Sequence, residues 1–242
     1  MRIGFVTDVH FREAITGEPH PKREFWRMRA TLEQCFQAYL DAGAELVICA
    51  GDDIDAPEGH PQTEADLVAF RDLFTASGLP HIIIPGNHDP ELETFYRVIP
   101  RPPRVLRLGD CEFITFYDDV VPPGQVRAVR PEHVLAELRD LLSHNPPGIS
   151  HTFLIQHYVI YPEYSGKGYP HTYQNDHAIR EIIEQSPRRI LSLSGHRHYG
   201  YPLIRHNGVT SFTGCALCER PYIYYILHAE PQTVTVQELS VV

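Results

Sequence analysis

The sequence of 242 residues lacks long apolar runs and lacks an excess of positive charge. No stretch approaches the ~18–20 consecutive apolar residues of a membrane-spanning helix, so no membrane partner is expected. Its 31 acidic residues outnumber 21 Lys and Arg residues, giving a formal net charge of -10. Because grip on a phosphate backbone rests on Lys and Arg, a nucleic-acid partner is not expected either. Internal repeats and convincing linkers are also missing, which indicates one domain over residues 1–242.

Cysteine is scarce and unpaired in the sequence. The chain has five cysteines, an odd number, scattered along its length. Cys215 and Cys218 form one CxxC pair, but the second pair that a structural zinc site would need is missing, so packing roles are favoured. The segment from Met1 to Asp8 reads as a strand that leads directly into a polar motif, and not as a cleavable leader. These features together predict a reduced, cytoplasmic protein.

Five short apolar runs have the length of buried strands, and amphipathic stretches lie between several of them. The runs are Ile3–Val6, Leu46–Cys49, Ile82–Ile84, Thr152–Ile155 and Ile190–Leu193. The stretches predicted to be helices are Glu24–Tyr39, Thr63–Ala76, Pro131–Leu142 and Asn175–Gln185. Strands that alternate with helices predict an α/β fold with much parallel pairing.

Later apolar runs follow each other after short turns and predict antiparallel hairpins in the second half of a sandwich. They are Val105–Leu108, Phe113–Phe116, Val209–Phe212, Tyr222–Leu227 and Val234–Leu239. The segment Tyr158–Tyr173 is rich in Tyr, Pro and Gly, which favours a long surface loop. The tyrosines at 222, 224 and 225 are read as strand packing.

Polar motifs follow the five early strands at the point where each one ends. They are Asp8-Val9-His10, Gly51-Asp52-Asp53-Ile54-Asp55, Gly86-Asn87-His88-Asp89, Gln156-His157 and Gly195-His196-Arg197-His198. Functional sites of open α/β sheets form outside the carboxyl ends of the strands, so these side chains are expected to converge. The glycines permit sharp turns. Ligands at i and i+2 of an extended backbone would point the same way.

The residue types in these motifs suit a pair of metal ions. Two divalent ions about 3.5–4 Å apart can hold the attacking and the leaving oxygen of a phosphoryl displacement. Mixed carboxylate and imidazole ligands favour Mn, Fe or Zn, and the absence of thiolates argues against a closed structural zinc site. The motifs therefore predict a phosphoesterase with a dinuclear transition-metal centre.

The order of the motifs resembles the calcineurin-like metallophosphoesterase superfamily, whose pattern is DxH, GDxxD, GNH followed by Asp or Glu, an isolated His, and GHxH. All five elements occur here in order, from residue 8 to residue 198. The resemblance implies a four-layered αββα sandwich with mixed sheets and a dinuclear site at the carboxyl ends of the strands. It also implies in-line attack on phosphorus by a hydroxide that bridges the metals.

Residue by residue, the resemblance implies two ligand sets with one bridging carboxylate. The first metal would be held by Asp8, His10 and His198. The second would be held by Asn87, His157 and His196, with Asp52 between the two ions. His88 would be the general acid or would stabilise the transition state, with Asp89 orienting it.

Several neighbouring residues allow more than one interpretation. His151 competes with His157 but starts its apolar run instead of ending it. Asp55 is expected to support the site or shape a turn, and Asp53 to be solvated. Arg197 and His171 are candidate substrate contacts, with outward-facing or packing roles as the alternatives.

The compact chain looks most like the class III cyclic nucleotide phosphodiesterase branch, which favours a small, nucleotide-like phosphorylated substrate. A nuclease is disfavoured by the charge of -10 and by the lack of a Lys/Arg run. A protein phosphatase is disfavoured because no extra segment for docking a protein is visible. A non-catalytic scaffold would tolerate loss of ligands, whereas the ligand set here is full. The sequence leaves the metal pair and the oligomeric state open.

Overall fold

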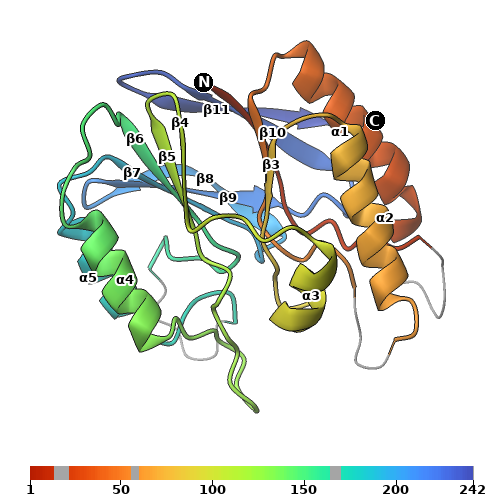
Figure 1. Cartoon of the computed structure of the whole chain (residues 1–242), viewed down its shortest axis with the longest axis horizontal. Helices are drawn as coiled ribbons and strands as arrows, with labels where there is room; N and C mark the ends of the chain where they lie inside the picture. Colours follow the sequence, from red (N-terminus) through yellow and green to blue (C-terminus); the bar gives the residue numbers. More distant parts are fainter. Residues whose placement is uncertain (14–21, 56–59, 164–169, 242) are drawn as a thin grey trace.

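Two β-sheets stacked face to face carry helices on both outer faces in the computed structural model, which describes residues 1–13, 22–55, 60–163 and 170–241 (Figure 1). The strands are β1 (Arg2–Val6), β2 (Leu46–Cys49), β3 (His81–Ile83), β4 (Val105–Leu108), β5 (Cys111–Thr115), β6 (His151–Ile155), β7 (Ile190–Ser194), β8 (Tyr199–His206), β9 (Val209–Cys215), β10 (Ile223–Ala229) and β11 (Val234–Ser240). The helices are the 3₁₀ turn η1 (Phe25–Arg27), α1 (Met28–Asp41), α2 (Thr63–Ala76), α3 (Leu92–Val98), α4 (Glu132–Leu142) and α5 (Asp176–Glu184).

Three buried apolar layers separate the secondary-structure layers. The first sheet has the order β11-β10-β1-β2-β3, and the second has the order β4-β5-β6-β7-β9-β8. Along β1, Val6 belongs to the layer under α1 and α2, while Phe5 belongs to the layer between the sheets. Leu154 of β6 packs with Leu138 of α4 in the third layer. This alternation, which follows from the period of two in a strand, confirms the predicted αββα sandwich.

Parallel pairing brings the polar motifs to one edge of the sandwich. Strands β1, β2 and β3 are parallel neighbours in the first sheet, and β6 and β7 are parallel neighbours in the second. The carboxyl ends of parallel strands point in one direction, so the segments that follow these five strands can meet. The backbone N–H of His196, after β7, donates to the carboxylate of Asp8, after β1, and so joins the two sheets there.

The predicted helices are present with small shifts at their starts. The prediction for Thr63–Ala76 matches α2, and the helix predicted from Glu24 begins as η1 before continuing as α1. Two elements were not predicted. Helix α3 spans only seven residues and fully buries only Phe95, so its periodicity is weak. Strand β8 is half exposed at a sheet edge and has no continuous apolar run.

The placement of the last hairpin corrects the sequence-based expectation. Strands β10 and β11 were expected in the second half of the sandwich, but β10 pairs antiparallel with β1 in the first sheet. The segment expected to be a surface loop is partly interior, since Tyr158, Tyr161 and Tyr173 are buried, while residues 164–169 lie outside the described part. Tyr222, Tyr224 and Tyr225 are buried, as expected for packing.

Two predictions about composition can also be compared with the structure. All five cysteines are free, and four of them are buried, which confirms that they are unpaired. In the part of the chain that the structure describes, no helix is long and apolar enough to cross a membrane.

Candidate metal centre

The segment after β1 is fastened to the segment after β2 by backbone hydrogen bonds. The N–H groups of Asp8 and His10 donate to the carbonyl oxygens of Gly51 and Asp52, at 3.0 and 2.9 Å. The expected extended backbone is wrong here, because Asp8, His10 and Asp52 have φ values of 52°, 47° and 54°. Left-handed conformations of this kind are uncommon outside glycine and cluster at functional sites, where the surrounding structure enforces them.

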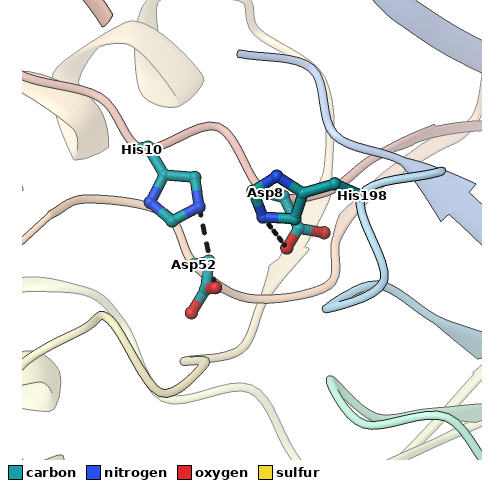
Figure 2. A group of neighbouring side chains, drawn as sticks. All are labelled: Asp8, His10, Asp52 and His198. Carbon is teal, nitrogen blue, oxygen red and sulfur yellow. Dashed lines mark ion pairs between the residues drawn. The ribbon is translucent and has the colours of Figure 1, made fainter. Parts of the chain in front are cut away.

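The first cluster consists of Asp8, His10, Asp52 and His198, whose ligand atoms all lie within 4.8 Å of one another (Figure 2). The Nε2 atom of His10 is 3.7 Å from Oδ2 of Asp52, and that of His198 is 3.4 Å from Oδ1 of Asp8. Asp8 and His10 are fully buried. Four converging carboxylate and imidazole groups at this spacing form a possible site for a transition-metal ion.

The second cluster consists of Asp52, Asn87, His157 and His196 and shares Asp52 with the first. The Nε2 atom of His157 lies 3.4 Å from Oδ1 of Asp52 and 3.2 Å from Oδ1 of Asn87. The same atom lies 3.2 Å from Nδ1 of His196. The structure thus brings together all seven residues that the sequence proposed as ligands, in two groups that meet at Asp52.

Two glycines allow the sheets to approach each other at the site. A Cβ atom on Gly195 would lie 1.8 Å from Oγ1 of Thr7 and 2.5 Å from Oδ2 of Asp8. A Cβ atom on Gly86 would lie 2.3 Å from Oδ1 of Asp52 and 2.8 Å from Cε1 of His157, which follows β6 in the second sheet. Any side chain at either position would therefore push apart the segments that carry the clusters.

In the first cluster, each imidazole contacts a carboxylate outside the cluster through its Nδ1 atom. The Nδ1 atom of His10 is 3.1 Å from Asp55, and the Nδ1 atom of His198 is 2.7 Å from Glu219. Because a carboxylate only accepts hydrogen bonds, each Nδ1 carries the proton and each Nε2 is left to face the cluster. Outer carboxylates of this kind fix the ring and raise its basicity as a ligand.

In the second cluster, each imidazole contacts a backbone carbonyl oxygen through one of its ring nitrogens. The Nδ1 atom of His157 donates to the carbonyl oxygen of Ala50 at 2.8 Å, which leaves Nε2 toward the cluster. His196 is turned the other way, since its Nε2 lies 3.4 Å from the carbonyl oxygen of Pro170 and its Nδ1 faces His157. Its backbone φ of 64° is again left-handed.

The electrostatics of the clusters favour positive charge. Burial opposes ionisation of Asp52, but His157, His10 and His88 hold its pKa well below the ordinary value. Burial alone would lower the pKa of His157, yet Asp52 raises it to about 9. The Nε2 atom of His10 is buried and, among the described residues, has no hydrogen-bond partner. Bound metal ions would offset the negative charge of the buried carboxylates and give Nε2 of His10 a partner. The residues therefore fit a metal centre.

His88 lies beside the first cluster and is positioned by an unexpected carboxylate. Its Nδ1 is 2.8 Å from Oδ1 of Asp55, and its Nε2 is 3.5 Å from Nη2 of Arg23. Arg23 also donates to both oxygens of Asp55. Burial lowers the pKa of His88, but Asp55 and Asp52 outweigh it, so the net direction is upward.

The expectation that Asp89 orients His88 is not supported by the geometry. The carboxylate of Asp89 accepts backbone N–H groups from Gly86, Asp53 and Ile54 at 2.7 to 3.1 Å. Burial raises the pKa of Asp89 to about 7. Asp89 therefore ties the loop after β3 to the loop after β2, and Asp55 is the residue that contacts the His88 ring.

Two further expectations can be compared with the structure. Asp53 was expected to be solvated but is fully buried, where it accepts a hydrogen bond from Cys49 Sγ at 2.8 Å. Burial accordingly raises the pKa of Asp53 well above its ordinary value. His151, the competitor of His157, contacts the carbonyl oxygen of Glu230 at 2.6 Å and is absent from both clusters.

An open hollow of about 530 Å³ lies against both clusters. It is lined by Asp52, His88, His196 and His198, together with Lys22, Arg23, His171, Arg197, Tyr199 and Glu219. The candidate substrate contacts Arg197 and His171 therefore lie on its wall. The His171 ring is 4.9 Å from that of His196.

Sequence reasoning missed Arg23, Lys22 and Glu219 in this site. Glu219 follows β9 and reaches His198 from a part of the chain that carries no motif. Arg23 and Lys22 precede η1 and are brought to the site only by tertiary packing. Asp55, the last residue of its motif, was expected to have a supporting role but was not paired with His88.

Two carboxylate and imidazole clusters that share one Asp at the edge of a β-sandwich define the class of dinuclear metallohydrolases. The model of the calcineurin-like phosphoesterase family matches residues 1–200. The chain belongs to this family and is a phosphoric ester hydrolase. Proteins of the family bind a dinuclear metal centre. No curated protein sequence matches the chain at a significant level.

Solved structures with little sequence identity share the fold. A dimetal phosphatase from Danio rerio superposes with a TM-score of 0.78 at 13% identity, covering 99% of this chain and 96% of that one. A purple acid phosphatase from yellow lupin gives 0.67 at 14% identity, covering 99% of this chain and 51% of that one. An archaeal phosphodiesterase gives 0.52 at 13% identity, covering 99% and 100%.

Proposed function

We propose that the first and second clusters hold two transition-metal ions and that the protein uses them to hydrolyse a small, nucleotide-like phosphoester. The observation that carries the proposal is the shared carboxylate of Asp52, which lies within reach of His10 on one side and His157 on the other. The remaining ligands are then Asp8 and His198 on the first side and Asn87 and His196 on the second. The oxygen and nitrogen donors favour Mn, Fe or Zn.

When bound, the two ions supply an activated water molecule and offset the negative charge of the phosphate. The chain supplies the geometry around them. Asp52 is held by the backbone N–H of His88 at 2.8 Å, and Asp8 by the hydroxyl of Thr7 at 2.7 Å. Fixing the carboxylates before substrate arrives lowers the cost of ordering the site during the reaction.

His88 is the proposed proton donor to the departing oxygen. Its Nδ1 is engaged by Asp55, and its Nε2, 3.5 Å from Nη2 of Arg23, is the ring nitrogen left to donate to a substrate in the hollow. The ring is 37% exposed, in contrast to the fully buried ring of His10. A donor that touches both the cluster and the hollow can reach the bond that breaks. Asp55 and Asp89 act as positioning residues, the first on the ring and the second on its loop.

A small substrate suits the dimensions and charge of the site. The hollow of about 530 Å³ falls within the range of about 300–1,000 Å³ that small-molecule sites occupy. The net charge of -10 disfavours a long nucleic acid. These features support a phosphodiester or phosphomonoester of nucleotide size.

The proposal can be tested with purified protein loaded separately with Mn, Fe or Zn. A panel of cyclic nucleotides, nucleoside monophosphates, phosphodiester dyes and phospholipid head groups would identify the substrate class. We expect two ions per chain by elemental analysis and loss of turnover on chelation. Active protein with one ion or none would remove the dinuclear assignment. Turnover only on long nucleic acids would remove the assignment of a small substrate.

A further inference from the structure

Two hollows flank the clusters, and they differ in charge. The cationic hollow is the one described above, and its lining includes Lys22, Arg23, His171 and Arg197. The acidic hollow, of about 420 Å³, adjoins Asn87 and His157 on the second cluster. Its described lining has no Lys or Arg and includes three carboxyl groups, those of Asp89, Glu91 and Asp119, the last of which is paired with Arg130 at 2.9 Å behind the wall. The metal centre therefore lies between two chemically different compartments.

Arg197 is held in place in the cationic hollow, whereas Lys22 makes an exposed contact there. The guanidinium carbon of Arg197 stacks 3.9 Å from the centre of the Tyr201 ring, and its Nη1 donates to the carbonyl oxygen of Gly200. The Nζ of Lys22 donates to the Tyr199 hydroxyl at 3.1 Å. Cations that are oriented before binding lose little freedom when an anion arrives, which raises its affinity.

The carboxylates of the cationic hollow are already engaged. Asp52 is the residue shared by the two clusters, and Glu219 is paired with His198 at 2.7 Å. Lys22 and Arg197 reach this wall from distant parts of the chain. The whole chain has a formal net charge of -10. Among the cations of the described lining, Arg23 is paired with Asp55, whereas Lys22 and Arg197 contact a hydroxyl, an aromatic ring and a carbonyl oxygen. Lys22 and Arg197 therefore favour an anionic ligand on this wall.

The position of His88 shows which part of the substrate enters this compartment. His88 lines the cationic hollow and does not line the acidic one. If His88 donates the proton to the departing oxygen, as proposed above, the leaving part of the substrate extends past it toward Lys22 and Arg197. The volume exceeds what one phosphate needs, so the leaving part has room for a second charged group.

We propose that the cationic hollow binds a second phosphate carried by the leaving group, and that the enzyme therefore prefers organic diphosphates to esters with an uncharged leaving group. The inference rests on the proposed function, because it uses the position of His88 in that reaction. It assigns Lys22 and Arg197 as specificity residues that contact the second phosphate, on the wall that Arg23 and His88 also line.

The test compares methylphosphonate with methylenediphosphonate, two unreactive probes that differ by one phosphonate group. Their dissociation constants are measured by calorimetry on protein loaded with Mn²⁺, with metal content checked afterwards. We expect the wild type to favour the diphosphonate. In Lys22→Gln and Arg197→Gln this preference should fall by about fivefold each. Arg205→Gln, a basic residue on the far part of β8 outside the cationic hollow, is the matched control.

The outcomes separate this inference from the function on which it rests. An unchanged preference in both variants, or an equal fall in Arg205→Gln, would overturn the second phosphate site. Wild-type turnover of bis(4-nitrophenyl) phosphate, whose leaving group carries no phosphate, is measured in parallel. If that ester and an organic diphosphate are both left intact by metal-loaded protein, the proposed function fails as well. If the ester is hydrolysed and the preference is unchanged, only the inference fails.

Discussion

The first and second clusters share Asp52 but differ in the groups that contact the outer nitrogens of their imidazoles. In the first cluster, His10 and His198 contact the carboxylates of Asp55 and Glu219. In the second cluster, the rings of His157 and His196 contact backbone carbonyl oxygens. Both kinds of partner orient the ring and raise its basicity, but only the carboxylates add negative charge. The difference teaches that the first cluster is the more anionic half, and we expect it to hold its ion more tightly.

Removal of the shared carboxylate should have the largest effect, because it damages both halves at once. Asp52→Ala is expected to lower kcat/KM by about 10³-fold or more, which corresponds to about 4 kcal/mol. It should also leave fewer than two ions per chain in elemental analysis. Asp72→Ala, an exposed carboxylate on α2, is the control. Turnover near that of the wild type would show that Asp52 does not bridge the halves.

His88 depends on the first half through Asp55, yet we expect it to bind neither ion. His88→Ala should therefore retain both ions and lose about 10²–10⁴-fold in rate on an alkyl ester. The loss should be much smaller on a nitrophenyl ester, whose leaving group needs no proton. His133→Ala on α4 is the control. Equal losses on the two esters would indicate charge stabilisation, and loss of an ion would make His88 a ligand.

The carboxylate behind His198 offers a direct way to weaken one half. Glu219→Gln keeps the shape of the side chain and removes its charge, so affinity for one of the two ions should fall about 10–100-fold. Stepwise metal titration followed by calorimetry would resolve the two binding events. Glu181→Gln on α5 is the matched control. If both ions weakened equally, the distinction between the halves would not hold.

The smallest expected effect is the difference in affinity between the two ions, which sets the order in which they leave. A weak chelator added in steps should first remove the ion of the second cluster, with affinities that differ by about tenfold. Native mass spectrometry would count the ions retained at each step. Asn87→Ala should lose the weaker ion and keep the stronger one. Loss of the stronger ion in this variant would reverse the ranking of the two halves.

Local sequence patterns predicted an α/β fold with much parallel pairing and the convergence of its motifs, and the family resemblance implied the four-layered sandwich. Apolar runs mark buried strands, and a polar motif after each strand lies at the edge where parallel strands end. The structure accordingly brings Asp8, Asp52 and His157 together from distant parts of the chain. Patterns of this kind are local, so they remain readable without any knowledge of tertiary contacts.

Contacts between different motifs, and partners outside the motifs, could not be predicted, because tertiary packing selects them. Asp89 follows His88 directly, which suggested a pair, but its carboxylate turns toward backbone amides of the loop after β2. Asp55 reaches the ring from that same loop. Glu219 and Lys22 carry no local signal. The left-handed backbone of Asp8 was missed because the hydrogen bond that enforces it comes from Gly51.

The pairing of β1 with β10 has a consequence for the order in which the protein is made. Arg2 lies opposite His228, so nearly the whole described chain must be synthesised before β1 gains this neighbour. Until then, one edge of the first sheet presents unpaired backbone groups beside the apolar residues of β1, a template for wrong pairing. The strand that precedes Asp8 is therefore made long before β10, which is the neighbour that encloses it. We expect β1 to need protection from wrong pairing until β10 has been synthesised.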